Sequence, residues 1–290
     1  MPAKAEKDAI TGVETTGHEW DGIRELNNPL PKWWLYVFYA TIVFAVVWWI
    51  LYPAWPWVHG HTTGILHSDQ RTILGQDMEA AHARQAAYLD RIAAQTPAQI
   101  NADAELQRFA IAGGEVLFKE NCAPCHGLGG AGRKGYPTLA DDDWLWGGTL
   151  EQIDYTIHHG IRNGVDPDAR DSQMPAFGAD GILTRPQIED VAQHVLSLTG
   201  QATDQTAAER GTAIFAQNCA ACHGDAGQGN KELGAPALND KIWLYGGSLQ
   251  QVEAQVTRPR QGVMPTWQGR LSDDSIKMLT VYVHSLGGGQ

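Results

Sequence analysis

The chain has 290 residues, enough for two small globular domains and additional segments. Its formal net charge is −12, which argues against nucleic-acid binding, because that function requires a basic surface. An acidic surface can steer a basic partner, although many proteins carry such a charge for solubility alone. All four cysteines lie in two C-x-x-C pairs, so none remains for a framework of structural disulfides.

The first predicted element is a membrane-spanning helix over residues 33–52. These twenty residues include no charged side chain. At a rise of about 1.5 Å per residue, they cover about 30 Å, the thickness of the hydrocarbon core of a bilayer. Tryptophan and tyrosine gather at both ends, as is typical at lipid headgroups. The run is too long for a signal peptide and no small-x-small pattern follows it, so we expect a permanent anchor.

Basic residues near this span indicate its orientation. Arg24 and Lys32 precede it, whereas the first lysine or arginine after it is Arg71. The positive-inside rule therefore predicts a cytoplasmic segment 1–32 and places the rest of the chain, after the span, in the periplasm of a bacterium.

Residues 53–105 are predicted to form a helical tether between the anchor and the globular part. The alanine- and glutamine-rich stretch 73–95 favours a helix, and Thr96-Pro97 ends it. Three histidines of the tether fit no strong metal-ligand spacing, so we expect surface polar residues, with a metal site as the alternative. They are His59, His61 and His67.

From about residue 106 the sequence repeats itself. Each copy contains an N-terminal helix, a C-x-x-C-H motif, a loop rich in glycine and proline, a middle helix, a Met-Pro pair and a final helix. The middle helices are expected at 150–160 and 249–256. Thr184 and Ser272 are the expected N-caps of the final helices.

This order of elements predicts the fold class and the domains. We expect an all-α protein in which one transmembrane helix is followed by two small helical domains. The first domain would cover residues 106–200 and the second residues 206–290.

The two C-x-x-C-H motifs indicate covalent attachment of two haem c groups, one in each domain. The thiols form thioethers with the haem vinyl groups, and the next histidine is the proximal iron ligand. A thioredoxin-like pair would need a βαβ context, and a zinc site is disfavoured because 93 residues separate the two pairs. The motif residues are Cys122, Cys125 and His126 in the first repeat and Cys219, Cys222 and His223 in the second.

Methionine is the predicted sixth ligand of both irons. Met174 and Met264 lie 48 and 41 residues after the histidine of their repeat, and each precedes a proline. A thioether sulfur suits iron, and His/Met coordination raises the reduction potential. Core packing is the alternative role of these methionines. His158 and His159 offer a bis-histidine alternative for the first haem, which would lower its potential.

The two domains resemble class I cytochromes c. By that resemblance, the carbonyls of Pro137 and Pro236 would accept a hydrogen bond from the proximal histidine and orient its ring. Trp144 and Trp243 would pack against haem or core. Bacterial haem c is attached outside the cytoplasm in this family, which agrees with the predicted orientation.

The segment 17–34, GHEWDGIRELNNPLPKWW, carries a resemblance to a more specific family. Together with the anchor, the tether and the tandem haem domains, it is similar to the dihaem subunit (CcoP, subunit III) of bacterial cbb3-type cytochrome c oxidases, over essentially the whole chain. The resemblance implies an inner-membrane subunit that contacts the haem–copper catalytic subunit. It would relay electrons from a soluble or membrane-anchored cytochrome c, through the monohaem subunit, to the oxygen-reducing centre.

The chain itself is expected to be a non-catalytic electron-transfer subunit. The span 33–52 has no histidine to hold haem b or copper, and the cofactor supplies the redox chemistry while the protein sets its potential and orientation. Alternatives are a dihaem peroxidase, a dihaem acceptor subunit of a periplasmic dehydrogenase and a haem sensor. The Met-Pro pairs disfavour a peroxidase, and only the N-terminal resemblance separates the oxidase from the dehydrogenase.

Overall fold

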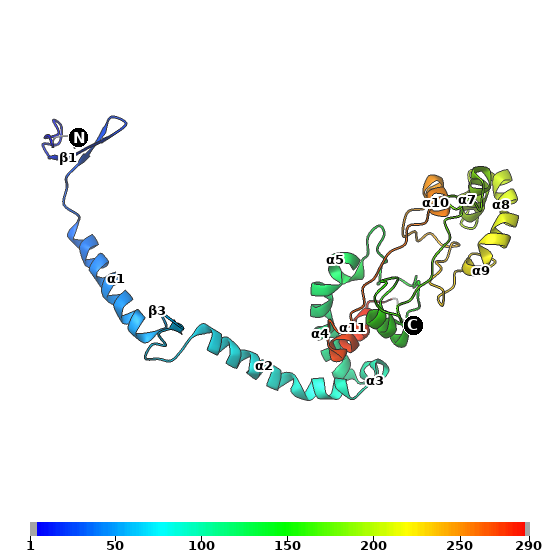
Figure 1. Cartoon of the computed structure of the whole chain (residues 1–290), viewed down its shortest axis with the longest axis horizontal. Helices are drawn as coiled ribbons and strands as arrows, with labels where there is room; N and C mark the ends of the chain where they lie inside the picture. The colour runs from blue at the N-terminus through cyan, green and yellow to red at the C-terminus, as the bar shows by residue number, and fades with distance from the viewer. Residues whose placement is uncertain (1–4, 288–290) are drawn as a thin grey trace. The chain divides into compact units, whose positions relative to one another are not determined.

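The computed structural model describes residues 5–287 and falls into two compact units, the first ending at Arg84 and the second beginning at Gln85. Figure 1 shows the elements in chain order. The outermost residues of the predicted ranges 1–32 and 206–290 lie outside the described part. Within it the predicted all-α class is confirmed, with two short hairpins in addition.

The N-terminal unit begins with a hairpin that is absent from the sequence-based prediction. β1 (Thr15–Trp20) pairs antiparallel with β2 (Ile23–Leu26). Asp21 and Gly22 join the strands with φ values of 48° and 83°, both in the left-handed region. Two-residue turns of this kind favour Asp-Gly, because their twist matches that of the strands.

Helix α1 (Lys32–Leu51) has the length and composition of a membrane span. It is 20 residues long, begins after Pro31 and has no buried residue. It ends at Leu51, because the backbone of the next residue, Tyr52, is extended, and Pro53 disfavours the helical region for Tyr52. Among the described residues it is the one helix long and apolar enough to cross a membrane, which confirms the predicted span.

A second small hairpin, β3 (Pro56–Trp57) with β4 (Gly60–His61), separates α1 from the long helix α2 (Gln70–Ala93). The Asp69 carboxylate accepts a hydrogen bond from the Thr72 amide at 2.9 Å and so caps the start of α2. The helix predicted in the tether is therefore present. Its three histidines are exposed, as expected for surface polar residues: His59, His61 and His67.

The second unit contains two groups of helices, and each group combines both sequence repeats. In the first group, α4 (Ala104–Asn121), α5 (Ala123–His126) and α6 (Leu150–His159) of the first repeat pack with α11 (Asp273–His284) of the second. The short helix α3 (Pro97–Ala102) packs against the same group. We call this group lobe A.

The second group, lobe B, is built from the opposite halves. Here α8 (Gln205–Asn218), α9 (Ala220–His223) and α10 (Leu249–Thr257) of the second repeat pack with α7 (Arg185–Ser197) of the first. Figure 1 shows α7 beside α8, and α11 beside α4.

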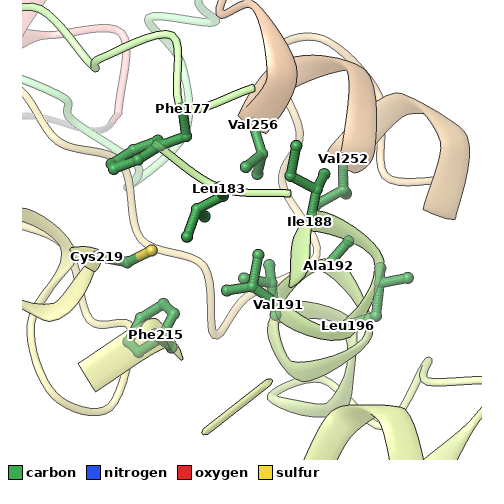
Figure 2. Packing of buried hydrophobic residues seen from close by; sticks show 11 residues of the cluster. Phe177, Leu183, Ile188, Val191, Ala192, Leu196, Phe215, Cys219, Val252 and Val256 are labelled. Carbon is green, nitrogen blue, oxygen red and sulfur yellow. The ribbon is translucent and has the colours of Figure 1, made fainter. Parts of the chain in front are cut away.

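The core of lobe B is apolar and joins residues of both repeats (Figure 2). Side chains of α7 and α10 face those of α8 and of the loop that precedes α7. The labelled members of this cluster are Phe177, Leu183, Ile188, Val191, Ala192, Leu196, Phe215, Cys219, Val252 and Val256.

A glycine lets the first and last helices of each lobe cross at close range. A Cβ atom on Gly114 of α4 would collide with the carbonyl group of Met278 in α11, and one on Gly211 of α8 with the carbonyl group of Asp190 in α7. The two glycines occupy equivalent positions in the repeats. Each N-terminal helix therefore crosses a C-terminal helix in the same way, and in both lobes that partner belongs to the other repeat.

The short turn between α7 and α8 explains this exchange. The Gln193 side chain, in a residue 3% exposed, accepts hydrogen bonds from the amides of Thr203 and Asp204 at 2.9 and 3.3 Å. Asp204 is also the N-cap of α8. Because this turn directs α8 back along α7, the first repeat's last helix packs on the second repeat's first helix. The ranges 106–200 and 206–290 thus mark the sequence repeats, whereas the packing groups have different boundaries.

The two lobes meet through equivalent residues. The Trp146 ring lies so close to Gly234 that a Cβ atom there would collide with it, and the Tyr245 ring lies 3.5 Å from the Cβ position of Gly135. The amide of Gly135 also donates to the carbonyl of Leu244 at 2.8 Å. The contact between the lobes is therefore nearly two-fold symmetric.

Candidate haem sites

Each C-x-x-C-H motif forms a single helical turn that directly follows a longer helix. In α5 the His126 amide donates to the Cys122 carbonyl at 2.9 Å, and in α9 the His223 amide donates to the Cys219 carbonyl at the same distance. This turn holds two thiols and an imidazole on one rigid piece of backbone. Attachment of a haem by two thioethers and one histidine requires that arrangement.

The histidines of the two motifs have the orientation that the resemblance to cytochromes c implies. Nδ1 of His126 lies 3.0 Å from the carbonyl oxygen of Pro137, and Nδ1 of His223 lies 2.9 Å from that of Pro236. With a proton on Nδ1 donated to the carbonyl, Nε2 keeps its lone pair for iron. The pKa of both imidazoles is lowered, because the effect of burial exceeds the opposing effect of the hydrogen bond to the carbonyl. Both rings are therefore predominantly neutral at pH 7, as ligation requires.

The four thiols are free, and two of them are sheltered from water. Burial, followed by the neighbouring thiol of the motif, raises the pKa of Cys122 and of Cys219 to about 11. Redox-active C-x-x-C pairs instead have a thiol with a depressed pKa. The electrostatics thus disfavour a thioredoxin-like function and suit an attachment site.

Each predicted methionine ligand lies next to the motif of the other repeat. Met174 packs against the lobe B core and lines a cavity of about 370 Å³ together with Cys222 and His223. Met264 packs against the lobe A core, where Cys122 also packs. The sequence pairs each methionine with the histidine of its own repeat, and the structure does not bring those residues together. The reason is that α7 and α11, which follow the methionines, pack on the other repeat.

Hydrogen bonds hold the Met264 loop at the end of α6. Ile161 and Met264 exchange two backbone hydrogen bonds of 2.9 Å each, and the Thr266 hydroxyl donates to the His158 carbonyl at 2.6 Å. The loop after Met174 is held in the same way. The Ala179 amide donates to the carbonyl of the last residue of α10 at 3.0 Å. Each methionine loop is thus bonded to the middle helix of the lobe in which its methionine lies.

The histidine alternative for the first haem is disfavoured by ion pairs. Nδ1 of His158 lies 3.2 Å from the Asp154 carboxylate, and Nε2 lies 3.0 Å from the Asp273 carboxylate. The Asp154 hydrogen bond first, and Asp273 in addition, raise the pKa of His158 to about 9, against an opposing effect of burial. A protonated imidazole with both nitrogens engaged has no lone pair for iron. His159 is held at 3.1 Å by Asp166.

Two buried indole N–H groups in the described part of the chain have no hydrogen-bond partner, those of Trp144 and Trp243. They occupy equivalent positions, and each ring covers a glycine, Gly148 or Gly247. Trp144 packs on the lobe A core, while Trp243 packs on the lobe B core and lines the cavity. An unpaired buried donor costs about 1–3 kcal/mol. Each lobe therefore offers a donor to an acceptor that the bound group would supply.

Basic side chains complete the cavity of lobe B. A group with carboxylate substituents, such as haem with its two propionates, suits both these cations and the indole donors. The residues thus fit a haem, although sequence reasoning assigned only packing roles to the two tryptophans and none to the cations. The cationic lining residues are Arg133, Lys134, Arg162 and Arg260.

Two C-x-x-C-H turns, each with an oriented histidine and a methionine packed against the core of the same lobe, are the features of a tandem cytochrome c, here preceded by one candidate membrane helix. Family models agree with this class. "Cytochrome c" matches residues 111–199, and "Cytochrome C oxidase, cbb3-type, subunit III" matches residues 206–283. "N-terminal domain of cytochrome oxidase-cbb3, FixP" matches residues 12–59, which include the hairpin and α1.

Curated relatives cover the whole chain. It is 53% identical to the cbb3-type cytochrome c oxidase subunit CcoP of Azospirillum brasilense, over 99% of this chain and 100% of that protein. It is 50% identical to the subunit FixP of Sinorhizobium medicae, over 98% and 97% of the two chains, and 48% identical to CcoP of Cereibacter sphaeroides, over 100% of both. The chain belongs to the CcoP/FixP family of cbb3-type cytochrome c oxidase subunits.

Proposed function

We propose that this chain is the dihaem relay subunit of a cbb3-type oxidase, with one covalently attached haem c in each lobe. The observation that carries the proposal is the repeated arrangement of a C-x-x-C-H turn, a histidine bonded to a proline carbonyl and a partly buried methionine. Haem supplies one-electron chemistry when bound. The chain's own residues attach it, orient its ligands and keep water away from its face.

In this proposal the ligands are crossed between the repeats. His126 and Met264 serve the iron of lobe A, and His223 and Met174 serve that of lobe B. Support comes from the packing of each methionine in the core of the corresponding lobe. Such His/Met pairs favour the high potentials that a relay towards oxygen needs.

A chain with a single haem tests both attachment and ligation. Replacing Cys219 and Cys222 by Ser is expected to leave one covalent haem per chain by pyridine haemochrome assay, in lobe A. In that background, Met264→His should remove the methionine–iron charge-transfer band and lower the potential, while Met174→His should leave both unchanged. The opposite result would establish ligation within each repeat, and two remaining haems would contradict the attachment residues.

We further propose that residues 1–32 are cytoplasmic and that both lobes are periplasmic. Support comes from Arg24 and Lys32, which precede α1, and from the absence of further lysine or arginine until Arg71. Phosphatase fusions test this orientation. A fusion after residue 287 should be active in the periplasm, and cytoplasmic activity of that fusion would reverse the topology.

The proposed partners are the haem–copper catalytic subunit, the monohaem cytochrome subunit and a cytochrome c donor. Support comes from the oxidase names of the relatives and from the match of the N-terminal family model to residues 12–59. Affinity purification of the chain from membranes should recover an oxygen-consuming complex. Recovery of a periplasmic dehydrogenase instead would overturn the oxidase assignment.

A further inference from the structure

Arg162 contacts the loops of both methionines. Its Nε donates to the carbonyl of Gly262 at 2.9 Å, and its Nη1 donates to the carbonyl of Ser172 at 3.0 Å. Gly262 and Ser172 each lie two residues before a methionine, Met264 and Met174 respectively. One guanidinium therefore bonds the same position of two equivalent loops, at the place where the lobes meet.

The backbone of Arg162 is held in an uncommon conformation. Its φ is 48°, in the left-handed region that residues other than glycine seldom occupy. The amide of Arg162 donates to the Arg170 carbonyl at 2.9 Å, and the preceding Ile161 exchanges two hydrogen bonds with Met264. Strained conformations of this kind persist where the surroundings impose them, and they gather at functional sites.

A second side chain joins the same two loops. Gln261, the neighbour of Gly262, donates from Nε2 to the carbonyl of Met174 at 3.1 Å. The methionine loops of the two lobes are thus bonded to each other both directly and through Arg162. A displacement of either loop would stretch hydrogen bonds of the other.

The charge of Arg162 is partly buried and faces no carboxylate at ion-pair distance within residues 5–287. The side chain lines the cavity that Met174 and His223 also line. Burial lowers the pKa of the guanidinium, and Tyr245 and Asp171 oppose this effect. Arginine nevertheless stays protonated in proteins. A fixed positive charge therefore lies between the two methionine loops, where it disfavours the oxidised form of a nearby redox centre.

We propose that Arg162 is a positioning residue shared by the two haem sites, holding both axial methionines in place and raising both reduction potentials with one charge. This inference rests on the crossed ligation proposed above. It makes the two sites interdependent, since a change at one guanidinium alters the ligand loop of each.

Full-length Arg162→Gln and Arg162→Lys variants test the inference, with Arg170→Gln as the control. Arg170 is also partly buried, but its side chain donates to Thr156 Oγ1 and the Gln152 carbonyl and to neither methionine loop. Redox titration and the methionine–iron charge-transfer band are measured with both haems, and again in chains that carry only one attachment motif.

Arg162→Gln should lower the potentials of both haems and weaken both charge-transfer bands. Arg162→Lys keeps the charge but cannot make the two-armed contact, so both bands should weaken with a smaller fall in potential. Arg170→Gln should leave both bands intact. If Arg162→Gln does not retain haem, the redox titration and the charge-transfer bands of Arg162→Lys test the proposal instead.

A change confined to one haem, or no change in either, would overturn the shared role. The single-motif chains separate this failure from failure of the crossed ligation. If Met264→His alters the lobe A haem while the Arg162 variants leave one site unaffected, only the inference about Arg162 falls. If Met264→His leaves that haem unchanged, the ligation on which the inference rests is wrong.

Discussion

Ile161 and Met264 exchange two backbone hydrogen bonds of 2.9 Å, although 102 residues lie between them in the sequence. This pairing holds the second repeat's methionine against the first repeat's middle helix. It follows from the packing of α11 on α4, which brings the last helix of the chain back to lobe A. The two candidate haem sites are therefore built from segments of both repeats.

The helix crossings predict a steric effect of adding one methyl group. Gly114→Ala and Gly211→Ala should each destabilise the chain by about 1–3 kcal/mol, because the new Cβ atoms meet backbone carbonyls. Gly75→Ala in α2 is the control, since nothing lies within 4 Å of its Cβ position, and helix propensity predicts no loss there. Urea unfolding followed by circular dichroism measures the difference. Equal stability of all three variants would contradict the close crossing.

The ion pairs of His158 predict a dependence of stability on pH. Its pKa is raised from 6.5 to about 9, first by Asp154 and then by Asp273. The stabilisation is therefore fully present below pH 6.5 and is lost as the pH rises through about 9. The difference in unfolding free energy between the wild type and His158→Gln should shrink over that window. The unfolding free energies of both proteins should be measured from pH 5 to pH 10. A difference between them that does not depend on pH would show that His158 is not charged in its ion pairs.

The unpaired indoles predict effects of opposite sign with and without haem. In the loaded protein, Trp144→Phe and Trp243→Phe should each cost about 1–3 kcal/mol if the indole N–H donates to an acceptor of the bound haem, because that bond would be lost. In a chain made without haem attachment, the same substitutions should be neutral or stabilising, since they remove a buried donor that lacks a partner. Thermal unfolding of both forms gives the comparison. A loss of similar size in both forms would show that the rings matter only through packing.

The thiols predict an order of chemical labelling in the chain without haem. Cys125 and Cys222 are exposed, whereas burial raises the pKa of Cys122 and Cys219 to about 11. Since the thiolate is the nucleophile, iodoacetamide at pH 8 should modify the exposed pair first. Mass spectrometry of timed samples reads the order. Simultaneous modification of all four would contradict the burial of the first cysteine in each motif.

The helices were predictable because their ends carry local signals. Thr149 and Ser248 form capping boxes at the starts of α6 and α10, and Thr184 and Ser272 precede α7 and α11 as expected. The N-terminal hairpin had an equally local signal in Asp21-Gly22, although the sequence analysis predicted no element in this segment.

The exchange between the repeats was not predictable from the sequence pattern. Gly114 and Gly211 do not specify their partner, because each meets a backbone carbonyl, which a C-terminal helix of either repeat offers. The choice depends on the seven-residue turn 198–204 and on its bonds to Gln193, which are tertiary features. For the same reason the lobe of each methionine and the contacts of Arg162 could not be predicted, whereas the two C-x-x-C-H motifs are visible in the sequence, and their role in haem attachment stays a prediction.

The order of helices in lobe B has a consequence for biosynthesis. Its four helices, α7 to α10, are consecutive in the chain, whereas lobe A begins with α4 and closes only with α11. Chains fold as they emerge from their N-terminal end. The second attachment motif therefore reaches a complete apolar core before the first does. The first motif emerges early in synthesis, yet the core of its lobe is completed only by the last helix of the chain.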